Sequence, residues 1–141
     1  MRARAAGRLS GVIRYLSLEW IEALTAEVAA SAAMQEAANG ARLGVTQVVT
    51  DGPEGDVTYH LQVDEGAARF DAGPAEPEDV RFVQDWETAV AVARGTLNAQ
   101  EAFIGGRIRL TGDQQKLLDS QPLFRALDSV FNAVRPRTDY R

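Results

Sequence analysis

The segment from Gly95 to Asp113 constrains the fold of this chain more than any other stretch. Its nineteen residues read GTLNAQEAFIGGRIRLTGD. Gly95 stops a preceding helix, and Asn98 with Glu101 three residues later is a capping-box pattern that starts the next one. Paired glycines then turn the chain into a short strand. The residues of this segment specify helix ends, a turn and a strand, but they include no obvious nucleophile, metal ligand or acid–base pair. We therefore expect it to shape an apolar cavity and not a reaction centre.

A helix of about twenty residues is predicted near the start of the chain from its capping residues and apolar spacing. Ser17 is a candidate N-cap, and apolar residues recur at helical spacing from Leu18 onward. An alanine-rich run with high helix propensity continues to Ala38. Asn39-Gly40 is then a natural helix end.

The middle of the chain changes to a period of two residues, which indicates strands. The clearest alternation runs over 57–64, and weaker strand signals cover 43–50, 67–72 and 80–83. Short turns separate the first three of these segments, so we expect antiparallel pairing. The Gly- and Pro-rich stretch 73–77 forms a loop, since proline cannot donate to a central strand.

Helical patterns return after Asp85, which can cap a helix ending at Gly95. A short helix follows over 98–103, then a fifth strand over 107–111 and a last amphipathic helix that Pro122 kinks. The long crossover before the fifth strand permits it to lie parallel to a neighbour. The element order predicts an α+β fold with a five-stranded, mostly antiparallel sheet covered on one face by helices.

Length and charge bound the organisation of the chain. Its 141 residues suit one domain, and we expect residues 1–15 to be a basic disordered tail, 16–134 the domain and 135–141 a second tail. The formal net charge of −5 leaves the body between the basic ends strongly acidic. Such a body repels nucleic acid. We expect the basic ends to make at most transient contact with a membrane. Without cysteines or a secretory signal, a cytoplasmic location is our expectation.

The residues offer no catalytic set, cofactor motif or metal site. His60 is the only histidine, which excludes a catalytic triad and any multi-histidine site, and the strand period places it on a polar, solvated face. The carboxylates of 76–79 lie in a proline-rich loop, where solvation explains them. Arg107 and Arg109 alternate with apolar residues and are expected on the open face of the sheet.

The segment from Gly95 to Asp113 resembles the sterol carrier protein 2 family, a family of small lipid-binding domains. The matching positions are Gly95, Leu97, Asn98, Gln100, Ala102, Phe103, Gly106, Ile108, Gly112 and Asp113. Thr96 replaces the family's lysine and Ala99 its proline, while arginines replace two further lysines. Losing proline at the first helical position weakens that helix start slightly.

The resemblance implies a sheet packed against helices with an apolar tunnel between them. The ligand would be a sterol, a fatty acid or an acyl-CoA, with no cofactor and no catalytic residue. The residues that would line the tunnel are Phe82, Trp86, Val90, Phe103, Ile104, Ile108, Leu110, Leu117, Phe124, Leu127 and Phe131. Phe103 and Ile108 in particular would face a space shared with the C-terminal helix.

Two other functions remain open at the level of sequence. An accessory or oligomerisation module would pack the same apolar surface on a partner protein or a second copy, helped by the small side chains of 19–38. An enzyme acting on a hydrophobic substrate would need an acid such as Asp85 or Glu101, and no positive signal supports one.

Overall fold

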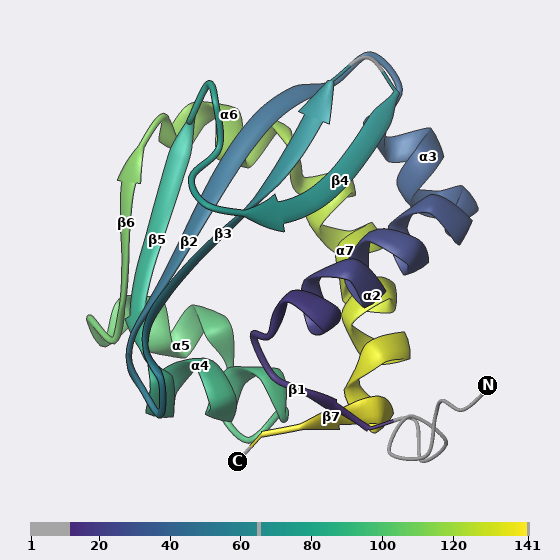
Figure 1. Cartoon of the computed structure of the whole chain (residues 1–141). Coiled ribbons are helices and arrows are strands. Elements are labelled where there is room, and N and C mark those ends of the chain that lie inside the picture. Colours follow the sequence, from purple (N-terminus) through teal and green to yellow (C-terminus); the bar gives the residue numbers. More distant parts are fainter. Residues whose placement is uncertain (1–11, 65, 141) are drawn as a thin grey trace, which may run out of the picture.

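A five-stranded sheet forms the centre of the protein (Figure 1). The structure, a computed structural model, describes residues 12–64 and 66–140. The sheet consists of β2 (Arg42–Gly52), β3 (Gly55–Asp64), β4 (Ala67–Ala72), β5 (Val80–Asp85) and β6 (Ile108–Gly112). Their spatial order is β4-β3-β2-β5-β6, and all neighbours are antiparallel except β2 and β5.

The expected α+β architecture is confirmed, with one difference in the sheet. The parallel pair involves the fourth strand of the sheet, β5, instead of the fifth, β6. The loop after β4 carries the chain across the sheet to the far side of β2, which makes β5 parallel to β2. The helical crossover that follows then returns the chain antiparallel beside β5.

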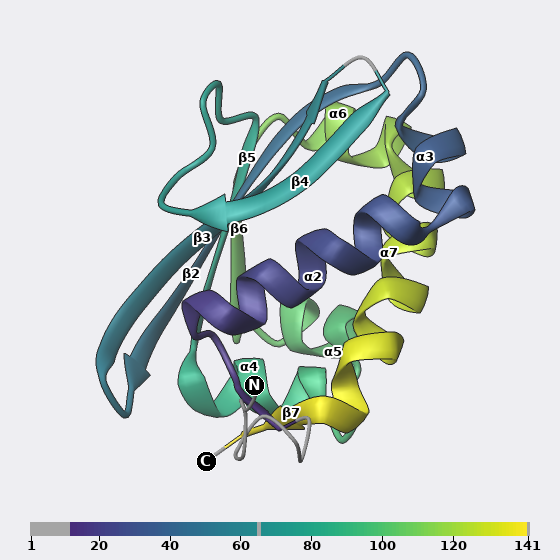
Figure 2. The same ribbon diagram turned by 45° about the vertical axis from the view of Figure 1, so that its right-hand side comes forward.

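Helices gather on one face of this sheet and at its ends (Figure 2). They are α2 (Leu18–Ala30), α3 (Ala32–Ala38), α4 (Trp86–Ala93), α5 (Ala99–Ile104), α6 (Gln114–Asp119) and α7 (Gln121–Val134), followed by the 3-10 turn η1 (Arg135–Arg137). The capping residues predicted for α4 and α5 are confirmed, because the side chains of Asp85 and Asn98 accept backbone N–H bonds of the first turns.

The first predicted helix is in fact two helices, α2 and α3, separated at Ser31. Ser31 has an extended backbone, and its hydroxyl accepts a hydrogen bond from the N–H of Met34 at 3.1 Å. Serine competes for backbone bonds in this way, which ends one helix and caps the next. The break lets both Met34 and Ala38 turn into the core, where they are fully buried.

Helix α2 covers the free edge of β4. The hydroxyl of Thr25 donates to the carbonyl of Phe70 at 2.9 Å and accepts from its N–H at 3.1 Å. One side chain thus satisfies both backbone groups that this residue of an edge strand would otherwise leave unpaired.

Helix α7 supplies the other large part of the core. Its buried residues recur at helical spacing and pack toward the sheet. They are Leu123, Ala126, Leu127, Val130 and Val134. Phe124 and Phe131 flank this stripe and are only partly buried.

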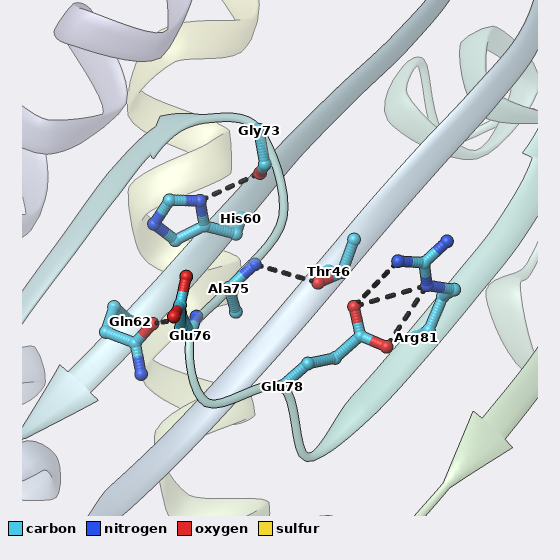
Figure 3. A network of polar contacts seen from close by, with 8 residues as sticks. All are labelled: Thr46, His60, Gln62, Gly73, Ala75, Glu76, Glu78 and Arg81. Atoms are coloured by element: carbon cyan, nitrogen blue, oxygen red, sulfur yellow. Dashed lines mark hydrogen bonds and ion pairs between the residues drawn. The ribbon is translucent and has the colours of Figure 1, made fainter.

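The opposite face of the sheet is crossed by the loop between β4 and β5 (Figure 3). The N–H of Ala75 donates to the Thr46 hydroxyl at 3.0 Å, and the N–H of Glu76 donates to Gln62 at 3.0 Å. His60 Nδ1 lies 2.8 Å from the Gly73 carbonyl. The prediction that His60 is solvated is therefore wrong: it is 8% exposed, because the loop folds back over its strand.

The two ends of the described chain pair with each other. Strand β1 (Ile13–Arg14) runs parallel to β7 (Thr138–Asp139), and the N–H of Tyr15 donates to the Asp139 carbonyl at 2.8 Å. Tyr15 is buried. Residues 13–15 and 135–140 thus belong to the fold and not to the tails expected from sequence. Residues 1–11 of the expected N-terminal tail lie outside the described residues.

Candidate functional site

A cavity of about 220 Å³ lies between the helix-covered face of the sheet and helices α2, α4 and α7. Three sheet strands, three helices and both ends of the described chain contribute to its wall. The lining residues are Tyr15, Trp20, Gln47, Tyr59, Gln84, Ala89, Val92, Ala93, Asp128, Phe131, Val134, Arg135, Thr138 and Tyr140.

Aromatic rings form a continuous part of this wall around Trp20. The Trp20 ring lies 4.9 Å from Tyr15 and 5.6 Å from Tyr59 between centroids, both in edge-on geometry. Phe131 stacks on it at 6.4 Å. Tyr140 extends the wall through Tyr15, at 5.0 Å. Such edge-to-face and offset contacts hold the rings in place and present a rigid apolar surface.

Two glutamines interrupt the apolar face of the sheet beside these rings. Gln47 on β2 stands in register with Tyr59 and Phe82, and Gln84 stands in register with Val49 and Ile108. Both positions face the helices. Gln84 Nε2 donates to Gln47 Oε1 at 3.4 Å, while the Gln84 Oε1 atom is buried without a hydrogen-bond partner in the protein.

The phenols of the wall stay neutral. Burial raises the pKa of Tyr59 and, together with the electrostatic influence of Tyr59 and Tyr140, raises the pKa of Tyr15 well above its ordinary value. Burial also raises the pKa of Tyr140. Charged side chains of the wall are Asp128 and Arg135, both exposed to solvent. The other residues that line the cavity are uncharged.

A second hollow, of about 330 Å³, lies between β1 and the hairpin of β2 and β3. It includes Trp86, Leu16 and Val57, together with the exposed ion pair of Arg14 and Glu54. The two hollows share the Tyr15 side chain.

Comparison with known protein families agrees with this architecture. The sequence profile of the SCP-2 sterol transfer family matches residues 21–125, most of the chain. The chain belongs to the SCP-2 sterol transfer family. The match begins in α2 and ends in α7, so it includes the whole central sheet of this family member.

Solved structures of the SCP-2 family share its fold. A conserved hypothetical protein from Thermus thermophilus, described as a possible sterol carrier protein, has a TM-score of 0.65 at 22% identity, covering 88% of this chain and 90% of that one. A crystal structure of sterol carrier protein 2 gives 0.63 at 21% identity, covering 86% and 97%. Palmitated sterol carrier protein 2-like 2 from Aedes aegypti gives 0.57 at 19%, covering 81% and 94%. A search of curated proteins finds no significant match.

The residues expected to line the SCP-2 tunnel fall in different places. Phe131 lines the 220 Å³ cavity, and Trp86 lines the second hollow. Ile108 and Leu127 are buried in the core. The partly buried residues that pack against that core are Phe82, Val90, Leu110, Leu117 and Phe124.

Two of the expected tunnel residues lie on the surface. Phe103 is 47% exposed and Ile104 83% exposed. In α5 the small residue Ala102 is the buried one. The short helix turns this alanine toward the sheet and directs the two larger side chains outward.

Sequence reasoning missed most of the residues that surround the cavity. A signal was present for the glutamines: in Leu43-Val45-Gln47-Val49 and Val80-Phe82-Gln84, a polar side chain takes a core-facing place in an apolar alternation. Polar residues at such positions are expected at functional sites. Tyr15 and Tyr140 had no comparable signal, since only the pairing of β1 with β7 brings them to the wall.

Other groups considered at sequence level have structural roles. Asp85 accepts the Thr88 N–H at 2.8 Å, and hydrogen bonds from the Thr88 side chain and backbone lower its pKa. Glu101 is exposed. Within residues 12–64 and 66–140, no group of three or more potential ligands could hold a metal ion. None of the helices described is long and apolar enough to cross a membrane.

Proposed function

We propose that this protein binds a hydrophobic small molecule, a sterol, a fatty acid or another acyl chain, in the 220 Å³ cavity and carries it without chemical change. The observation that carries this proposal is the cavity itself, lined by the sheet and three helices in a member of the SCP-2 family. The palmitated relative from Aedes aegypti supports an acyl chain as one ligand class.

The wall of the cavity supports binding over catalysis. Burying apolar ligand surface against Trp20, Tyr59 and Phe131 favours association by roughly 25 cal/mol per Å² removed from water. The inner polar groups are amides and neutral phenols. Such groups orient a ligand by hydrogen bonds, as in other apolar binding sites.

The test is a displacement titration on delipidated protein. N-phenyl-1-naphthylamine, a neutral fluorescent probe, should bind saturably and be displaced by sterols or acyl lipids. In the variant Ala93→Phe a ring would fill the cavity, because Ala93 lies on its wall. This variant should lose probe binding and remain folded.

A matched control distinguishes the effect of filling the cavity from the effect of adding a ring to the protein surface. Ala133→Phe adds the same ring to the exposed side of α7, and Ala133 is not among the residues that line the cavity. It should bind the probe as the parent does. If the parent fails to bind any lipid, or if both variants bind it equally, the carrier function is excluded. A discrete oligomer without lipid binding would instead favour the accessory module.

A further inference from the structure

One residue of the cavity wall, Gln84, carries a buried hydrogen-bond acceptor that no donor of the described residues satisfies. Oε1 of Gln84 is buried and has no hydrogen-bond partner among the described residues, and Gln84 is one of the residues that line the cavity. An unsatisfied buried polar group is unfavourable and calls for a partner from outside the protein. A ligand that carries a donor would supply it.

We propose that the preferred ligand is a neutral single-chain lipid whose head-group hydroxyl donates a hydrogen bond to Oε1 of Gln84. This inference rests on the proposed function and adds the polarity and the size of the ligand. In it, Gln84 is the residue that determines head-group specificity.

Gln47 is the residue that orients Gln84. Its Oε1 accepts from Gln84 Nε2 at 3.4 Å, which occupies the donor end of the Gln84 amide and leaves the acceptor end free. The two strands that carry these residues, β2 and β5, are hydrogen-bonded neighbours at the centre of the sheet. The amide pair is therefore held on two strands that hydrogen-bond to each other within the sheet.

An ionised carboxylate is a poor head group beside Gln84. Its oxygens only accept hydrogen bonds, as Gln84 Oε1 does, so the two would repel. Turning the amides around would offer a donor, but a buried anion also needs a counter-charge. Arg135, the cation among the lining residues, is exposed to solvent, and Asp128, which also lines the cavity, is acidic.

The size of the cavity favours one chain over a fused ring system. Its 220 Å³ is below the range of roughly 300–1,000 Å³ that is usual for pockets enclosing drug-sized ligands. The wall is built from rings that contact one another, Tyr15, Trp20 and Tyr59 among them. A flexible chain fits beside them with less displacement than a rigid sterol.

The experiment compares four ligands on the delipidated full-length protein by displacement of N-phenyl-1-naphthylamine. They are 1-dodecanol, dodecanoate, 1-methoxydodecane and cholesterol. The alcohol and the methyl ether share chain and oxygen, but only the alcohol donates. One satisfied hydrogen bond predicts that the alcohol binds about tenfold more tightly than the ether. Dodecanoate and cholesterol should also bind more weakly than the alcohol.

The variant Gln84→Met keeps the length of the side chain and removes the acceptor. It should bind the alcohol and the ether equally, with ether binding unchanged or improved. Gln100→Met on the exposed surface of α5 is the matched control and should keep the tenfold preference. Circular dichroism checks that each variant is folded.

A measurement on the unmodified protein does not depend on any variant. The side-chain amide signals of Gln84 and Gln47 in ¹⁵N–¹H spectra should shift when dodecanol is added, and that of Gln100 should not. Three results would overturn the inference while leaving lipid binding intact. They are equal binding of the alcohol and the ether, tighter binding of dodecanoate or cholesterol than of the alcohol, and a preference for the alcohol over the ether that persists in Gln84→Met. Absence of any displacement would instead refute the proposed function.

Discussion

The carbonyl oxygen of Pro77 lies so close above Gly44 that a Cβ atom on residue 44 would come within 1.9 Å of it. The same atom would lie 3.1 Å from the Ala75 side chain. The loop between β4 and β5 can therefore rest on the sheet only because residue 44 has no side chain. The Gly44 N–H also donates to Asp79 Oδ2 at 2.7 Å, which anchors the end of this loop.

Gly44→Ala should consequently destabilise the protein. Either the loop or β2 must move, and overpacking of this kind is typically unfavourable by about 1–3 kcal/mol. Urea unfolding followed by circular dichroism measures the loss. Proteolysis should locate new cleavage sites in 73–78. A variant as stable as the parent, with the loop equally protected, would contradict the contact.

Thr25→Val should also lower stability, through a different mechanism. The substitution keeps the shape of the side chain but removes the hydroxyl that bonds both backbone groups of Phe70. Leaving those groups unsatisfied is expected to destabilise by about 1–3 kcal/mol. Thr111→Val on the exposed surface of β6 serves as the control and should have little effect in the same urea titration. Equal effects of the two changes would argue against an edge-covering role for Thr25.

Phe131→Ala and Phe103→Ala should have different effects on probe binding, because one residue lines the cavity and the other lies on the surface. Phe131 lines the cavity and stacks on Trp20, so its truncation should weaken binding of a hydrophobic probe severalfold through lost apolar contact. Phe103 is 47% exposed and should be dispensable for binding. Probe titrations on both variants give the answer. If only Phe103→Ala lost probe binding, the ligand site would lie beside Phe103, as expected from sequence.

The carboxylate of Asp85 should make stability depend on pH. Hydrogen bonds from Thr88 hold its pKa below the ordinary value of 3.8, so the stabilisation is fully present above about pH 4 and is lost as the pH falls through the folded-state pKa. Asp85→Asn keeps an acceptor for the helix cap but cannot titrate. The urea midpoint should therefore decrease more between pH 7 and pH 3 for the parent than for the variant. Identical declines would show that the cap does not titrate in this range.

Local signals were sufficient to predict most of the fold. Asp85 and Asn98 mark helix starts through the preference of their side chains for backbone N–H groups, and the structure uses both in this way. The alternation over 57–64 likewise predicted β3. These features depend on near neighbours in the chain, which is why sequence alone reveals them.

The candidate site was harder to predict because it depends on contacts between distant segments. His60 has the pattern of a solvated residue, and only the return of the 73–78 loop buries it. Phe103 lies in an apolar helix, but sequence periodicity over six residues cannot say which side faces the sheet. Gln47 and Gln84 become a pair only through the parallel register of β2 and β5.

The pairing of β1 with β7 brings the two ends of the described residues side by side. Ile13 pairs with Thr138 and Arg14 with Asp139. The residues that directly follow these two short strands, Tyr15 and Tyr140, line the cavity. Chain ends that lie together in this way permit circular permutation. A permutant that joins these two ends covalently would connect β1 and β7 through a continuous loop beside the cavity, without altering the central sheet.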